Sequence, residues 1–454
     1  MLSLRLASRP DTRVLTAASL LLAAAFGGGL VMPLLFWAGL VAATMAGILF
    51  LAYRHVAGFC VAWLLAAGMT LEMTIYDIGG DAMFQLTIAV VKAIGIVLAL
   101  LCALRYGARF DGLNPAWAYL AMLITGLAHG LFPGLTAGAS LRSCIGSVAP
   151  FAFCFCRPPR AWRDAIIRAT AWCPVAAVTA CMPLAAAGLR PLFVDSGGMR
   201  LTGLGHPAFL AGVSLWAIYA CLVLLYRHGR PGHLGLLVAN FVILLLTGAR
   251  APLAYAVAVT GLSLVSIRST VFPPRWRLLL CLTGAAVVLA LLPFAADMTG
   301  IRLFNVLTNA AGNLSGRALL WPPFEDAAAQ SPWVGWGLGA GNAIIPPHGA
   351  IAQLLHTWAA HNEYLRIEVE GGQLGRATLI GLFAAWVLVR TAGLCPSDRR
   401  IMRLAFLAFA GHAATDNILI STPACVFFAF TAAVFADAGR AAPRLALNAP
   451  PQVA

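Results

Sequence analysis

Runs of about twenty apolar residues recur along this chain, and each is long enough to cross a membrane as a helix. The first run, from Val14 to Phe26, is followed at once by a second, from Leu30 to Tyr53, which predicts a helical hairpin and not a cleaved signal peptide. Hydrophobic residues make up 61% of the 454 residues and charged residues only 10%. A soluble domain of this length needs a more polar surface. The sequence therefore predicts an all-α polytopic integral membrane protein.

The apolar segments predict about 12–14 transmembrane helices. Since their number is even, both termini are expected on the same side of the membrane. The segments lie near residues 13–29, 31–52, 56–72, 84–104, 115–133, 137–156, 165–187, 207–226, 233–248, 251–267, 277–295, 375–390, 404–417 and 421–436.

The basic residues decide the orientation of these helices. The formal net charge is +14, but the arginines stand in short clusters between apolar segments, which argues against a nucleic-acid binder. The clusters recur on the side of the N-terminus, so the positive-inside rule predicts that both termini are cytoplasmic. Residues 296–374 then form one long periplasmic loop before the last three spans of a single transmembrane domain, 1–454. We expect helices over 317–329 and 351–369 in this loop, separated by a Gly/Pro-rich turn region, 332–347.

Arginines on the outer face run against this bias and need a separate reason. Arg200 precedes the span that begins at Pro207, and Arg250 lies at the outer turn between two short spans. Their planar guanidinium groups suit a phosphate or diphosphate, with capping of a helix end or binding of a lipid headgroup as the alternative. Lys92 and Arg142 are charges within predicted spans, which are functional candidates unless they snorkel to the membrane surface.

His361 is the strongest single candidate for chemistry, because it ends the long outer loop beside a glycine-containing segment. A histidine there can act as a base near neutral pH, although a lone histidine is more often structural. The pair Asp416-Asn417, near the outer end of a late span, could orient a neighbouring side chain by hydrogen bonding. If the segment is a helix, glycines let one of its faces pack tightly on another helix. That face carries His361, Leu365, Glu368, Gly372 and Gly375.

The sequence offers no support for a metal or a cofactor. It contains no Asp-x-Asp pair, and no cluster of His, Asp and Glu has the spacing of metal ligands. The glycine-rich segment 332–342 neither follows a strand nor carries a P-loop lysine, so it is not a nucleotide site. A Gly-x-Ser-x-Gly nucleophile elbow is also absent.

The pattern that begins at His361 resembles a motif of the O-antigen ligase/polymerase superfamily of bacterial envelope glycosyltransferases. In the ligase branch, a His is followed by Asn, Ser or Gln, nine arbitrary residues, Gly, two more residues, and Gly, Thr or Tyr. Here His361 and Asn362 are followed by nine residues, Gly372, two residues and Gly375. The fit to the ligase branch is therefore specific.

Other segments between about Arg200 and Phe435 are also similar to family features. They are the Gly-Arg…Trp segment 316–321, the Pro…Gly-x-Gly-x-Gly segment 332–339, and Arg250. Arg250 departs from the family's Arg-x-x-x-Leu element, because the leucine falls one place early, at 253.

The resemblance implies a fold of usually twelve spans in the bacterial inner membrane and an active site facing the periplasm. It implies transfer of a glycan from undecaprenyl diphosphate, the donor, to a sugar hydroxyl of lipid A–core oligosaccharide, the acceptor. We expect a metal-independent reaction, inverting at the anomeric centre, with His361 as base and Arg200, Arg250 and Arg142 on the diphosphate. The supporting residues are expected to be Asn362, Glu363, Glu368, Gly372, Gly375 and Arg317.

Several alternatives stay open. Glu363 or Glu368 could act as a nucleophile in a two-step reaction. A polysaccharide polymerase or a protein O-oligosaccharyltransferase of the same superfamily shares the donor and differs in the acceptor. A lipid-linked sugar flippase without catalysis belongs to another class, which commonly shows internal repeats and charges near the midplane. Here the unusual polar groups collect on one face, which favours an enzyme.

Overall fold

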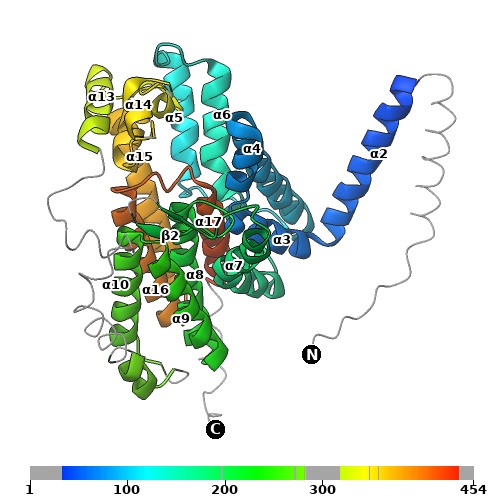
Figure 1. The fold of residues 1–454 in the computed structure, drawn as a ribbon, viewed down its shortest axis with the longest axis vertical. Helices are drawn as coiled ribbons and strands as arrows, with labels where there is room; N and C mark the ends of the chain where they lie inside the picture. Colours follow the sequence, from blue (N-terminus) through cyan, green and yellow to red (C-terminus); the bar gives the residue numbers. More distant parts are fainter. Residues whose placement is uncertain are drawn as a thin grey trace, which may run out of the picture. The chain divides into compact units, whose positions relative to one another are not determined.

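The computed structural model describes residues 33–195, 198–269, 272–280, 282, 317–346, 348–355 and 357–438 (Figure 1). The chain divides into two compact units, Met1–Phe59 and Cys60–Ala454. The described part of the first unit consists of α2 (Pro33–Arg54) and the beginning of α3 (Val56–Met69).

The second unit is built almost wholly of helices, so the prediction of an all-α polytopic membrane protein is confirmed. In the described part of the chain, the exception is one antiparallel hairpin of β1 (Phe193–Asp195) and β2 (Met199–Leu201), in which Val194 lies opposite Arg200. The helices are α4 (Glu72–Tyr106), α5 (Ala116–His129), α6 (Ala137–Val148), η1 (Ala149–Phe155), α7 (Arg160–Ala186), α8 (Pro207–His228), α9 (Pro231–Leu246), α10 (Arg250–Ser266), α13 (Arg317–Gln330), η3 (Ala340–Asn342), α14 (Ala350–Leu355), α15 (Glu363–Ala392), α16 (Pro396–Ala413) and α17 (Thr422–Phe435).

The helices follow the apolar pattern of the sequence closely. Among the described residues, five helices are long and apolar enough to cross a membrane, and a sixth is reached if α2 and α3 are taken together. Helices α5, α9, α10 and α17 are shorter apolar helices. Every predicted span from 31–52 to 251–267 and from 375–390 to 421–436 overlaps a helix. The predicted span 13–29, and 277–295 from residue 283 on, lie outside the described residues. The number of spans stays a prediction.

Helix α8 forms the centre of the second unit, and it packs against α7, α9, α10, α16 and α17 (Figure 1). Its residues are apolar on all sides, which suits a helix surrounded by protein. An aromatic cluster joins it to α16 and α17: the rings of Trp216 and Phe427 lie 4.4 Å apart, and those of Phe409 and Phe427 stack at 4.8 Å. This core fixes the loop between α16 and α17, which carries part of the candidate site.

Ion pairs join the helix ends that the sequence predicts to be cytoplasmic. Arg227 at the end of α8 lies 2.7 Å from Asp398 and 3.0 Å from Asp437. Arg390 at the end of α15 lies 2.7 Å from Asp111. Charges that are largely withdrawn from water are tolerated when they are paired in this way. The arginines of these inner ends therefore also connect helices that are far apart in the sequence.

Helix α15 is broken at Gly372, where the backbone adopts φ 61° and ψ −166°. The break frees backbone groups on both sides, and the glycine-rich segment 332–337 satisfies them, as buried backbone polar groups require. A Cβ at Gly372 would come within 2.4 Å of the carbonyl atoms of Trp333. The four hydrogen bonds run from Trp336 N to Val369 O (2.9 Å), Gly337 N to Glu370 O (3.0 Å), Gln373 N to Pro332 O (2.8 Å) and Leu374 N to Trp333 O (3.1 Å).

A single added methyl group tests this interlock. Gly372→Ala should lower the free energy of unfolding by about 2 kcal/mol or more, because it combines an unfavourable positive φ with a clash against backbone. Gly381→Ala is the matched control on the same helix, since a Cβ there meets nothing within 4 Å. Thermal or denaturant unfolding in detergent measures both variants. Equal stability of the two would show that the break does not depend on glycine.

Candidate functional site

His361 lies two residues before α15 and not on it. The sequence predicted a continuous helix over 351–369, which is wrong: α14 ends at Leu355 and α15 begins at Glu363. Asn362 is the N-cap of α15, because its side-chain oxygen accepts hydrogen bonds from the two backbone amides at positions 364 and 365, at 3.1 and 3.2 Å. The predicted common helix face of His361 and Gly372 is therefore wrong as well. His361 itself has φ 48°, a left-handed conformation that is rare outside glycine.

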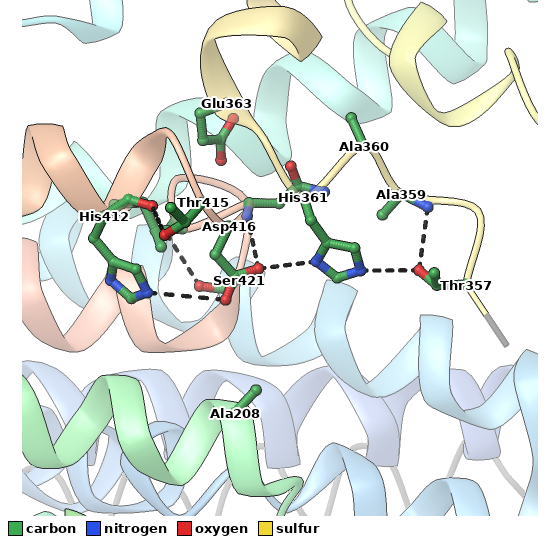
Figure 2. Close-up of polar contacts among 12 residues, drawn as sticks. Ala208, Thr357, Ala359, Ala360, His361, Glu363, His412, Thr415, Asp416 and Ser421 are labelled. Atoms are coloured by element: carbon green, nitrogen blue, oxygen red, sulfur yellow. Dashed lines mark hydrogen bonds and ion pairs between the residues drawn. The ribbon is translucent and has the colours of Figure 1, made fainter. Parts of the chain in front are cut away.

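The imidazole of His361 is held at both nitrogens (Figure 2). Nδ1 lies 3.1 Å from Oδ1 of Asp416, and Nε2 lies 3.0 Å from the hydroxyl oxygen of Thr357. An ionised carboxylate only accepts hydrogen bonds, so Nδ1 carries the proton and Nε2 of the neutral ring accepts from the Thr357 hydroxyl. The His361 side chain is 38% exposed. The arrangement presents a basic nitrogen to an alcohol group near the protein surface.

Asp416 is placed by the loop between α16 and α17. Its Oδ1 also accepts a hydrogen bond from the backbone N–H of Asn417 at 2.8 Å, and its Oδ2 lies 4.0 Å from Nε2 of His412. Burial by itself raises the pKa of the Asp416 carboxyl, but the hydrogen bond from His361, together with that from the Asn417 backbone N–H, lowers this pKa below its usual range. Asp416 is therefore a carboxylate at neutral pH, as its orienting role requires.

Glu363 connects the start of α15 to that same loop. It is buried, and its Oε1 accepts the backbone N–H of Leu419 at 2.7 Å. Its Oε2 accepts from Nε of Arg366 at 2.7 Å, while Nη1 of Arg366 donates to Glu370 at 2.6 Å. This buried triad holds His361 and Asp416 on neighbouring rigid segments.

The remaining supporting residues of the motif have packing roles. Glu368 pairs with Arg376 across the break in α15, which joins the two halves of the helix. A Cβ at Gly375 would lie 3.0 Å from the side chain of Met122 on α5, so this glycine allows the close helix contact that the sequence predicted. Gly372 lies against segment 332–337 instead of a helix.

Arg200 contacts the turn between α9 and α10, and Arg250 follows that turn. Arg200 on β2 is buried, and its Nε donates to the carbonyl oxygen of Thr247 at 2.8 Å. Arg250 follows three residues later as the first residue of α10, and it is exposed. Arg200 therefore binds the turn from which α10 begins, and a joint role of the two arginines stays a prediction.

Arg142 lies elsewhere, on the wall of a cavity of about 480 Å³. Lys92 lines the same cavity, whereas Arg200 and Arg250 are not among the described residues that do so. Arg317 begins α13, and its side chain is outside the described part of the structure. The candidate cations therefore form two groups and not one.

Trp321 on α13 contacts the backbone directly before His361. Trp321 donates from its indole nitrogen to the carbonyl oxygen of Ala360 at 3.0 Å, which joins the segment before α15 to α13. The apolar cluster around Leu320, Phe324 and Val369 gives this region its own core. Thr357 was not predicted as a site residue, because a threonine within a loop carries no signal of a tertiary hydrogen bond. Across the described residues, no group of three or more His, Cys, Asp or Glu side chains could hold one metal ion.

These features define a class: an all-α polytopic membrane protein with a histidine–carboxylate pair at one end of its helices. Residues 235–380 match the family model described as O-Antigen ligase, so this part of the chain is similar to the O-antigen ligase family. The matched segment runs from α9 to the middle of α15, so it includes Arg250 and His361, whereas Arg200 and Asp416 lie outside it. No curated protein matches the chain.

The cap of α15 can be tested without touching the imidazole. Asn362→Ala should lower the free energy of unfolding by about 1 kcal/mol, because the two backbone amides lose their acceptor. Asn362→Ser should stay close to the parent protein, since a hydroxyl also caps a helix. Denaturant unfolding of the two variants gives the comparison, and an unchanged midpoint for the alanine variant would contradict the assigned role.

Proposed function

We propose that this protein is a membrane glycosyltransferase that moves a glycan from undecaprenyl diphosphate to a sugar hydroxyl of lipid A–core oligosaccharide on the periplasmic face. The observation that carries the proposal is the His361–Asp416 pair, in which Nε2 of His361 accepts a hydrogen bond from the Thr357 hydroxyl. The match to the O-antigen ligase family over residues 235–380 supports the donor and acceptor.

In the proposed reaction His361 is the general base. The Thr357 hydroxyl, 3.0 Å from Nε2, marks the place where an acceptor hydroxyl would bind after displacing it. The acceptor oxygen forms a bond to the anomeric carbon of the glycan as the bond from that carbon to the diphosphate oxygen breaks. The hydroxyl proton passes to Nε2, and Asp416 stabilises the resulting imidazolium. Undecaprenyl diphosphate leaves with the bonding electron pair.

A single displacement with inversion is favoured over a two-step route. Glu363 and Glu368, the candidate nucleophiles, are engaged by Arg366 and Arg376. A carboxylate in such an ion pair is a weaker nucleophile, and Glu363 is also buried. Charge that develops on the leaving diphosphate would be stabilised by guanidinium groups, for which Arg142, Arg200 and Arg250 are the candidates.

An apolar groove supports a lipid-linked donor. It has a volume of about 380 Å³ and runs along α15 and α16, where Phe383 and Leu407 line its wall. Glu363 and Tyr364, next to the segment that carries His361, belong to its lining, as do Arg376 and Arg403. A lipid tail in this groove would bring its headgroup toward the base. The basic, ion-paired helix ends lie on the predicted cytoplasmic side, which would leave His361 facing the periplasm.

Loss of the imidazole should abolish transfer. His361→Ala is expected to lower the transfer rate by about 10²–10⁴-fold while membrane insertion persists, because a general base contributes on that scale. Asp416→Asn should reduce the rate in the same direction, since an amide does not hold the imidazole in the required tautomer. The matched control is His348→Ala, an exposed histidine that begins the described segment 348–355.

The assay uses the purified protein with lipid-linked glycan and three candidate acceptors: lipid A–core, a growing glycan chain and a protein. Modified lipid A–core that depends on His361 supports the ligase. Modification of the chain or the protein instead would assign the polymerase or the protein transferase, and no acceptor modified despite donor binding would point to a flippase.

Arg250 should tolerate no replacement by a point charge. Arg250→Lys keeps the positive charge but loses the planar fork that binds two phosphate oxygens, so we expect about tenfold lower kcat/KM for transfer. Arg400→Lys is the control at the opposite helix ends, where Arg400 donates to the carbonyl oxygen of Ser266. Full activity of Arg250→Lys would remove bidentate phosphate binding from the account.

A further inference from the structure

The Asp416 carboxylate lies between two histidines (Figure 2). Its Oδ1 lies 3.1 Å from Nδ1 of His361, and its Oδ2 lies 4.0 Å from Nε2 of His412. His412 belongs to the last turn of α16, whereas His361 precedes α15. Two imidazoles from different parts of the chain therefore approach different oxygens of one carboxylate.

His412 is buried much more deeply than His361. Its side chain is 5% exposed, against 38% for the side chain of His361. Two aromatic rings pack against it: the ring centroids of Trp216 on α8 and Tyr255 on α10 lie 6.4 and 6.1 Å from that of the imidazole. Within the described ranges, Nδ1 of His412 is buried without a hydrogen-bond partner.

These surroundings decide which nitrogen of His412 carries the proton. Burial disfavours a charged imidazole, so the ring is neutral and has a single N–H. On Nδ1 that N–H would be buried without an acceptor, which costs free energy. On Nε2 it lies next to the Asp416 carboxylate. The contact is longer than a hydrogen bond, so it attracts through the N–H dipole and the charge, in surroundings of low dielectric constant that strengthen it.

The backbone of His412 also places Asp416. The His412 carbonyl oxygen accepts the backbone N–H of Thr415 at 2.9 Å, the hydroxyl of Thr415 at 3.0 Å and the backbone N–H of Asp416 at 3.1 Å. A Cβ at Gly411 would come within 2.6 Å of the hydroxyl oxygen of Tyr255, so glycine lets α10 approach this end of α16. His412 and Asp416 are therefore joined through the backbone as well as through their side chains.

Packing alone does not explain a histidine at position 412. A phenyl ring would fill the same space between Trp216 and Tyr255 without burying two nitrogens. A buried polar group costs free energy unless it has a partner. In the described part of the chain, Asp416 is the charged group that His412 contacts. The nitrogens of His412 are therefore explained by the carboxylate and not by the aromatic packing.

We propose that His412 is a positioning residue for the transfer reaction, and that its Nε2–H holds the Asp416 carboxylate with Oδ1 toward His361. The inference rests on the proposed function. With Oδ2 attracted to His412, Oδ1 stays with His361 and with the backbone N–H of Asn417. The proton of His361 is then kept on Nδ1, and its Nε2 remains the base. Because His412 is neutral, the full charge of Asp416 is left to stabilise the imidazolium that forms on His361.

Two substitutions separate positioning from packing in the transfer assay. His412→Phe keeps an aromatic ring and removes the N–H, whereas His412→Gln keeps an N–H donor and removes the ring. We expect His412→Phe to lower kcat about tenfold with an unchanged KM, because the base is misplaced, and His412→Gln to keep most of the parent rate. A tolerated phenylalanine with an inactive glutamine variant would assign packing and overturn the inference. His228→Phe, at the exposed last residue of α8, is the matched control.

The ¹⁵N signals of His361 test the same role without turnover. In the His412→Phe protein we expect the fraction of His361 with its proton on Nδ1 to fall, and His412→Gln should restore it. Unchanged His361 signals and unchanged transfer in His412→Phe would overturn the inference and leave the proposed function standing. A shift of the His361 proton in His412→Phe, with no transfer by the parent protein, would keep the positioning of the imidazole and remove the function.

Discussion

The hydrogen bond between Nδ1 of His361 and the Asp416 carboxylate is the interaction on which the site depends. It joins the segment before α15 to the loop between α16 and α17, which are 55 residues apart in the sequence. It also decides the chemistry, because a proton fixed on Nδ1 leaves Nε2 as the basic nitrogen. Glu363 links the same two segments a second time, because its carboxylate accepts a hydrogen bond from Leu419 N.

This junction is possible because α15 does not extend back through His361. Asn362 starts the helix, and Trp321 holds the backbone before it. Ten residues further on, Gly372 breaks the same helix, and segment 332–337 takes up the freed backbone groups. The spacing between His361 and Gly372 therefore fixes the base relative to the glycine-rich segment. In this motif Asn362 and Gly372 therefore have structural roles, and His361 is the residue for which a chemical role is proposed.

The sequence predicted the helices well, because apolar runs of span length have few alternatives in a membrane. It also predicted the loop helix 317–329, which is α13, while the roles of His361 and Arg250 stay predictions. It failed at the break between α14 and α15. His361 fits the helical periodicity of the residues that follow it, so the sequence pattern does not show that Asn362 caps the helix and leaves His361 outside it. The hydrogen bond between Asp416 and His361 depends on tertiary packing of segments far apart in the chain. The same holds for the position of Arg142 and Lys92 on the wall of one cavity. No local pattern specifies such pairs.

The most direct test of this account is the protonation of the two imidazole nitrogens. Protein labelled with ¹⁵N-histidine, compared with a His361→Gln sample to assign the signals, gives the ¹⁵N shifts of this ring at neutral pH. We predict a neutral ring with the proton on Nδ1 and an unprotonated Nε2, and loss of that preference in Asp416→Asn. A proton found on Nε2, with Nδ1 bare, would contradict the account.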